Sequence, residues 1–378
     1  MDKVDDSVIE RIQQKAFSAA QSLLPQPVQV LFYDCTTLYF ESFQADELRA
    51  QGFSKDGKHA EVQVLLALLC TPEGLPVGYQ LWPGNTFEGH TLPEAIEQIE
   101  KHYSIEQLVF TADSGLLSRA NIAYLQERGH HYVLGARLKS LNQQLKGQIL
   151  DNQGYKDMGE GYLVKEIEAE GKRLVVSYSP NRARKDAHER KEALEKLKKK
   201  LGKSKNPASM LSNFGYKKYL KVEGDAQIEE DPEKVAAAAQ WDGLLGVWSN
   251  APGQDYSGQQ LLERYRGLWQ IEGCFRVGKT DMRLRPIYHW TPRRIKAHIA
   301  ICFMALVCMR YLAYYLKVRD IRMSEAAIRK ALNQVQVSIL KHQKSGERYG
   351  IPSRKTPEAQ QIYKALGLKL SDIPFPIA

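Results

Sequence analysis

The sequence of 378 residues has only five cysteines. Their spacing excludes metal sites in which closely spaced pairs of cysteines are the ligands. No C-x-x-C pair occurs, so we expect neither a zinc site nor disulfides, but buried thiols in a reducing cytoplasm. A glycine-rich phosphate loop of the G-x-x-x-x-G-K type is also missing, so we expect no nucleotide cofactor. The first residues form no apolar signal core, which argues against secretion.

A hydrophobic run of membrane-spanning length is lacking as well. The apolar segment from Ile299 to Met309 has eleven residues and lies between His298 and Arg310. A membrane span needs about twenty such residues, so we predict a buried core helix and no membrane partner. His298 is more typical of a core or phosphate-contacting side chain than of a metal ligand.

The sequence has an excess of positive charge, with a net charge of +9. Its hydrophobic residues make up 43% of the chain. The segment 182–205 holds eleven Lys or Arg against four acids and so carries +7 of the total. A charge run of this kind is commonly a solvated helix. A dense run of positive charge also suits contact with a DNA backbone, here through Lys198, Lys199 and Lys200.

A helix predicted across residues 265–279 carries an acid among aromatic and basic side chains. At 3.6 residues per turn, one stripe collects Tyr265, Trp269, Glu272, Arg276 and Lys279. A carboxylate that holds a cation, basic groups for phosphates and rings that stack on bases are what a phosphodiester site needs. An ordinary amphipathic helix with core aromatics and an i,i+4 ion pair stays open as the alternative.

Two further acids occur upstream in settings that suit a site. Asp34 lies in a β-branched and aromatic run, 28–40, which predicts a strand, and its carboxylate needs a partner or a metal there. Asp113 follows a short apolar run and precedes a turn, with Ser118 as the N-cap of the next helix. For both, a structural role through hydrogen bonds to nearby backbone or hydroxyl groups remains an alternative.

The order of the predicted elements favours an α/β fold with a mixed sheet and a ribonuclease-H-like core. Three antiparallel strands at 28–40, 59–70 and 75–82 precede a helix at 91–103, and the Asp113 strand follows. In such a core the acids come from the first strand, the fourth strand and a late helix.

Taken together, these segments resemble the DDE transposases of bacterial insertion sequences. The sequence is most similar to the branch with a Tyr-x2-Arg-x3-Glu-x6-Lys pattern, which Tyr265, Glu272 and Lys279 match. Leu268 replaces the Arg of the pattern, so its phosphate contact would fall to Arg264, Arg266 or Arg276. The resemblance covers roughly residues 28 to 315 and makes Asp34, Asp113 and Glu272 the expected catalytic, metal-binding acids.

The resemblance also implies a domain division. We expect an N-terminal helical segment at 1–27 and a discontinuous catalytic core at 28–150 and 241–316. Between the two parts of the core we expect a β-rich insertion at 151–240, which contains the basic helix 182–205. A C-terminal helical region is expected at 317–378. The short segment before Asp34 is expected to be too small for a helix-turn-helix.

The activity implied is cleavage at the element ends and transfer of the 3′-hydroxyl ends to target DNA. The three acids would hold two Mg²⁺ ions, with Mn²⁺ as a substitute. Tyr265, Arg266, Arg276 and Lys279 would contact double-stranded DNA, and Trp269 would either stack on an unpaired base or pack. A homodimer on DNA and a bacterial, nucleoid-associated location are expected.

Three other functions share some of these features. A ribonuclease-H-like nuclease or resolvase would use the same acids without joining DNA ends. A catalytically inactive, repurposed DNA-binding protein would keep the basic segment and not depend on the acids. A glycosidase using two of the carboxylates fits the positive charge poorly.

Overall fold

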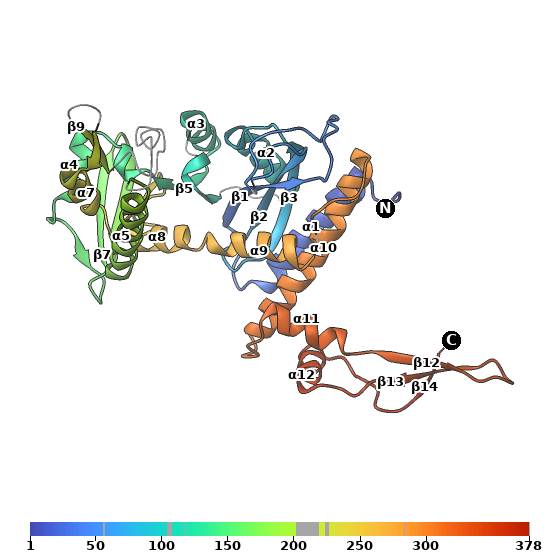
Figure 1. The fold of residues 1–378 in the computed structure, drawn as a ribbon. Coiled ribbons are helices and arrows are strands. Elements are labelled where there is room, and N and C mark those ends of the chain that lie inside the picture. Colours follow the sequence, from blue (N-terminus) through green and yellow to red (C-terminus); the bar gives the residue numbers. More distant parts are fainter. Residues whose placement is uncertain are drawn as a thin grey trace. The chain divides into compact units, whose positions relative to one another are not determined.

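The computed structural model describes the chain except residues 56, 104–107, 117, 202–218, 224–226, 283 and 378. The described residues form a mixed α/β structure, as the sequence predicts. Figure 1 shows the helices and strands as a ribbon coloured by residue number. Contacts within the chain divide it into two units. Unit 1 comprises Met1–Glu106 and Leu268–Ala378, and unit 2 comprises Gln107–Gly267.

Unit 1 contains an antiparallel sheet in the order β3-β2-β1. Its strands are β1 (Val30–Tyr39), β2 (Gln63–Cys70) and β3 (Pro76–Pro83). Residues of β2 are buried along the whole strand, and β1 is buried except at Asp34 and Tyr39. The three strands predicted before the first long helix are therefore confirmed, and a half-buried carboxylate stands alone in an otherwise buried stretch of β1.

Helices cover this sheet and connect it to the C-terminal part of unit 1. They are α1 (Asp6–Leu23), α2 (Leu92–Tyr103), α9 (Trp269–Thr280), α10 (Pro292–Lys317), α11 (Glu325–Asn333) and α12 (Pro357–Ala365), with the 3-10 turn η1 (Glu88–His90). Side chains start several of them: Asp5, Ser324 and Thr356 each accept a backbone N–H as N-cap.

Helix α10 is longer than the predicted apolar segment and less buried. Within the described residues it is the helix that is long and apolar enough to cross a membrane, by length and composition alone. Its inner face packs against α1 and β3, where the Tyr311 hydroxyl donates to the Ala16 carbonyl oxygen at 2.8 Å. The prediction of a core helix thus holds for this face. It is wrong for the opposite face, where Ile301, Met304 and Cys308 are exposed.

The C-terminal part of unit 1 differs from the helical region expected there. Helix α11 ends at Asn333, and Val337 begins a three-stranded antiparallel sheet in the order β12-β13-β14. The strands are β12 (Val337–Lys341), β13 (Arg348–Pro352) and β14 (Phe375–Ile377). The chain turns from helix to strand here because the β-branched residues after Gln336 pair with β13.

Unit 2 is built on a mixed sheet in the order β4-β5-β11-β8-β7-β6. The strands are β4 (Val109–Ala112), β5 (His131–Ala136), β6 (Lys156–Asp157), β7 (Leu163–Ala169), β8 (Lys172–Tyr178) and β11 (Leu244–Ser249). Strands β4 and β5 are parallel, and the other neighbours within this set are antiparallel. The parallel pair is connected by a helix, as parallel strands require.

The remaining elements of unit 2 surround this sheet. Helices are α3 (Arg119–Glu127), α4 (Gln143–Leu150), α5 (Pro180–Leu201), α7 (Pro232–Ala239) and α8 (Gly258–Arg266), with 3-10 turns η2 (Ser114–Leu116) and η3 (Leu138–Ser140) and the hairpin β9 (Leu220–Glu223) and β10 (Gln227–Glu230). Helix α8 lies against β5, β7, β8 and β11. Ser118 caps α3, as predicted.

The boundaries of the two units differ from those of the domains expected from the sequence. The expected domain division stays a prediction. Strands β7 and β8 lie in the expected insertion, 151–240, yet β8 pairs with β11 from Arg173 to Tyr178. Strands β6, β7 and β8 of that segment thus extend the sheet that contains β4 and β5, whereas β9 and β10 form a separate sheet.

The cysteines are free thiols, of which four are buried and Cys308 is exposed. The expectation of buried thiols is therefore wrong for Cys308, because it lies on the outer face of α10. The Sγ atoms of Cys70 on β2 and Cys274 on α9 lie 3.7 Å apart.

Candidate active site

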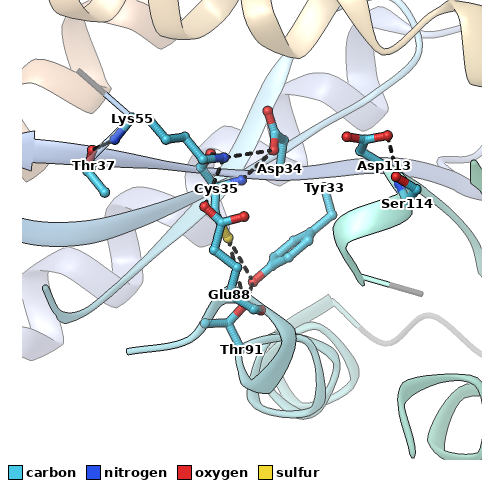
Figure 2. A network of polar contacts seen from close by, with 9 residues as sticks. All are labelled: Tyr33, Asp34, Cys35, Thr37, Lys55, Glu88, Thr91, Asp113 and Ser114. Carbon is cyan, nitrogen blue, oxygen red and sulfur yellow. Dashed lines mark hydrogen bonds and ion pairs between the residues drawn. The ribbon is translucent and has the colours of Figure 1, made fainter. Parts of the chain in front are cut away.

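Asp34 is the first predicted acid, and β1 holds it at a buried sheet surface. Its Oδ1 accepts the backbone N–H of Cys35 at 2.8 Å, and its side chain is 31% exposed. The neighbouring Cys35 thiol is not a competing nucleophile, because burial raises its pKa to about 12 and keeps it protonated. The Lys55 ammonium, which no sequence pattern indicated, lies 3.9 Å from Asp34 Oδ1 (Figure 2).

Asp113, the second predicted acid, directly follows β4 and is exposed. Its Oδ1 accepts the Ser114 backbone N–H at 2.7 Å, and the Tyr265 hydroxyl donates to the same oxygen at 3.0 Å. The sequence predicts a contact between Tyr265 and a phosphate, whereas the hydroxyl is directed at a predicted catalytic carboxylate. Tyr265 therefore positions Asp113 within unit 2.

The Tyr265 ring reaches this place because β5 has no side chain at Gly135. A Cβ atom at Gly135 would overlap the hydroxyl and ring of Tyr265. The start of α8, which carries Tyr265, is fixed by a capping box between Ser257 and Gln260. The Gly258 N–H also donates to Glu166 on β7 at 3.1 Å. The helix is thus held at its first turn as well as along the sheet.

Glu272, the third predicted acid, is exposed on α9. The continuous helix predicted over residues 265–279 is wrong, since α8 ends at Arg266 and α9 begins at Trp269. Gly267, a poor helix former, ends α8 with its N–H bonded to the carbonyls of residues 263 and 264. The predicted stripe is therefore split, and Tyr265 and Glu272 lie on different helices.

The part of the stripe on α9 keeps its predicted order. Trp269, Glu272 and Arg276 are exposed and Lys279 is half-buried, whereas residues such as Ile271 and Phe275 pack inward. With its side chain 61% exposed, Trp269 does not serve as a core residue.

Trp269 and Arg276 line a groove on unit 1 of about 760 Å³. The other basic side chains of its lining are Arg310, Lys317 and Arg322, and the acids of the lining are Glu73, Asp320 and Glu325. Arg310 is already engaged, because it donates to Glu325 at 2.6 Å and to the Gly74 carbonyl at 2.8 Å. The groove therefore combines an exposed aromatic ring with basic groups.

The other predicted DNA contacts lie in unit 2. Arg266 stacks on the Tyr162 ring, with the guanidinium carbon 4.4 Å from the ring centre. Lys198 and Lys199 are exposed on α5, and the Lys200 side chain lies outside the described residues. Exposed i,i+4 ion pairs, such as Lys185 with Glu189 at 3.7 Å, neutralise part of this helix and contribute little to stability.

Carboxylate oxygens are the donors that Mg²⁺ and Mn²⁺ prefer, so the chemistry of Asp34, Asp113 and Glu272 fits such ions. The described residues nevertheless contain no group of three or more His, Cys, Asp or Glu side chains placed to hold a metal. Asp34 and Glu272 belong to unit 1 and Asp113 to unit 2. The three-carboxylate site therefore stays a prediction.

Comparison with known proteins gives one family. A family model described as the transposase DDE domain matches residues 25–308. This range contains Asp34, Asp113 and Glu272. A comparison with curated proteins gave no match.

Among solved structures, the chain is similar to the piggyBac transposase in a synaptic complex with hairpin DNA, at 10% identity and a TM-score of 0.43. This match covers 81% of the chain and 52% of that transposase, so the chain spans about half the length of the protein it matches. The Mos1 transposase in a paired-end complex with the left transposon end is matched at 12% identity and a TM-score of 0.21, over 34% of the chain and 43% of that protein.

Proposed function

Because the chain belongs to the transposase DDE domain family, we propose that it is a DNA transposase. It would cut the ends of a mobile element and transfer the 3′-hydroxyl ends to target DNA. The observation that carries this proposal is the family match over residues 25–308, which includes the three acids singled out from the sequence. Asp34 on a buried strand and Asp113 at the end of β4 support it.

In this proposal Asp34, Asp113 and Glu272 are the ligands of two Mg²⁺ ions, with Mn²⁺ as a substitute. Bound ions of this kind activate an attacking oxygen and stabilise the departing one in an in-line displacement at phosphorus. The chain itself supplies the carboxylates and their orientation: the Cys35 N–H fixes Asp34, and the Ser114 N–H and Tyr265 hydroxyl fix Asp113.

The reaction needs no external energy source, since hydrolysis of the first phosphodiester is favourable and the transfer step exchanges one phosphodiester for another. In the first step, water forms a new P–O bond, the P–O3′ bond breaks, and the 3′-oxygen takes up a proton. In the second step, the freed 3′-hydroxyl attacks a target phosphodiester in the same way. The exposed residues Trp269 and Arg276 with Lys279 would hold the DNA, through base stacking and phosphate contacts.

We further propose a bacterial insertion sequence as the source, from the branch with the Tyr-x2-Arg-x3-Glu-x6-Lys pattern. Tyr265, Glu272 and Lys279 match this pattern, and Leu268 departs from it. Double-stranded DNA would be the partner, with two copies of the chain acting on two ends. The protein would then work at the bacterial nucleoid.

The test is a cleavage and strand-transfer assay on a plasmid that carries the DNA flanking the gene, with Mg²⁺, Mn²⁺ or EDTA. The wild type should cut at the flanks and form joined products in either metal, and Glu272→Ala should abolish both. Cutting without joining would favour a nuclease or resolvase. Binding without cutting would favour an inactive DNA-binding protein, and either result would overturn the proposal.

A further inference from the structure

Lys55 lies beside Asp34 and is held there by two oxygen atoms. Its Nζ lies 2.8 Å from Glu88 Oε1 and donates to the Cys35 carbonyl oxygen at 2.6 Å. The same nitrogen lies 3.9 Å from Asp34 Oδ1 (Figure 2). Asp34 is therefore near the ammonium but beyond hydrogen-bond distance.

The surrounding residues fix both Lys55 and Glu88. The Lys55 backbone N–H donates to Thr37 Oγ1 at 3.1 Å. The Glu88 carbonyl oxygen accepts the Thr91 hydroxyl at 2.7 Å, and the buried Tyr33 hydroxyl donates to that of Thr91 at 2.6 Å. A lysine side chain is flexible in water, and these contacts hold its charged end in one place.

The Lys55 ammonium is oriented by the oxygen atoms that accept its hydrogen bonds. Two of its three N–H donors point to Glu88 and the Cys35 carbonyl. The side that faces Asp34 is the side from which a ligand bound at this carboxylate would approach.

We propose that Lys55 is a catalytic residue whose ammonium binds a non-bridging oxygen of the phosphodiester that is cut beside Asp34. This inference rests on the proposed function. In phosphoryl transfer the charge is spread over the equatorial oxygens of the phosphorus, and a fixed cation there stabilises the transition state. Glu88 is then a positioning residue that acts through Lys55.

The first test needs no DNA and compares Mn²⁺ binding to the wild type, Lys55→Met and Lys58→Met by electron paramagnetic resonance. Removing a positive charge next to the Asp34 carboxylate should make Mn²⁺ bind about threefold or more tightly in Lys55→Met. Lys58, in the same loop, pairs with Glu61 at 3.4 Å, and its variant should bind Mn²⁺ like the wild type. Unchanged or weaker binding in Lys55→Met would overturn the inference.

The second test uses the gene-flanking duplex with a neutral methylphosphonate at the mapped cleavage position, bound in Ca²⁺. The neutral linkage should weaken wild-type binding about tenfold and have no further effect in Lys55→Met. With Mg²⁺ and normal DNA, Lys55→Met should lower the cleavage rate about 100-fold, whereas Lys55→Arg should keep part of it. If the methylphosphonate weakens DNA binding by Lys55→Met as much as it weakens binding by the wild type, the role of Lys55 is refuted. Cleavage by Lys55→Met within about threefold of the wild-type rate would refute it as well.

The two tests separate the inference from the function on which it rests. A wild type that neither binds nor cuts the flanking DNA contradicts the proposed function. The Mn²⁺ measurement still decides in that case whether the ammonium acts on the Asp34 site.

Discussion

Arg173 on β8 holds the start of α8 in place, and its removal should loosen the helix that carries Tyr265. The side chain is buried and donates to the carbonyl oxygens of Ala251 and Tyr256 at 2.8 and 3.0 Å. It also pairs with Glu166 at 2.5 Å, and this carboxylate accepts the first N–H of α8. Arg173→Leu therefore removes the donor of two carbonyls and the partner of one carboxylate.

The expected loss in local stability is about 3 kcal/mol, at the lower end for breaking a buried ion pair, because Glu166 is half-exposed and regains water. Hydrogen exchange measured by mass spectrometry is the suitable assay, since it reports the opening of one segment of a chain with two units. Amides of residues 257–262 should exchange about 100-fold faster in Arg173→Leu, because each 1.4 kcal/mol is a factor of ten.

Lys185→Leu is the matched control, because it removes an exposed pair in the same unit and should change exchange by less than threefold or so. If Arg173→Leu exchanges no faster than this control, the carbonyls have other donors and the reasoning fails.

Three further predictions follow from single contacts. Gly135→Ala should displace Tyr265 and lower DNA cleavage about fivefold, as Tyr265→Phe would, through loss of one hydrogen bond to a carboxylate; wild-type cleavage by both variants would speak against this role. Although burial raises the pKa of Asp46, hydrogen bonds and the Arg49 guanidinium hold it below 3.8. The ionised Asp46 carboxylate therefore stabilises the folded protein fully at pH values above its ordinary pKa. This stabilisation is lost as the pH falls through the lower pKa that Asp46 has in the folded protein. The difference in melting temperature between the wild type and Asp46→Asn should be constant above about pH 5 and shrink below it, and a constant difference down to pH 2 or so would contradict the shift. Neutralising the lysines at 198–200 should flatten the plot of log K for DNA binding against log salt by up to about 3 units, and an unchanged slope would remove this helix from the DNA contacts.

Much of the fold could be predicted because local patterns and packing agree. The β-branched and aromatic run around Asp34 forms β1, and the apolar run before Asp113 forms β4. Ser118 accepts the Asn121 N–H at the start of α3, as its place before a helical pattern predicts. In these segments the local pattern alone indicates the type of element, although β1 and β4 are completed by pairing with β2 and β5.

The remainder depends on contacts that are distant in sequence. The helical pattern continues across Gly267 without interruption, and a glycine costs only about 1 kcal/mol in a helix, so packing decides whether the helix breaks there. The strand after Gln336 needs its partner β13, and only the β-branched residues and the Ser345-Gly346 turn signal it. Lys55 lies 21 residues from Asp34 in an irregular segment, where no periodicity places its ammonium.

The proposed mechanism requires that Asp34, Asp113 and Glu272 hold the same metal ions. Backbone cleavage by bound Fe²⁺ with ascorbate and peroxide tests it most directly, because the radicals cut only near the ion. Cuts are expected beside all three acids, and they should be lost together when Mg²⁺ is added in excess or when any one acid is replaced by Ala. Cuts confined to one of the three segments, or cuts that persist in Glu272→Ala, would contradict it.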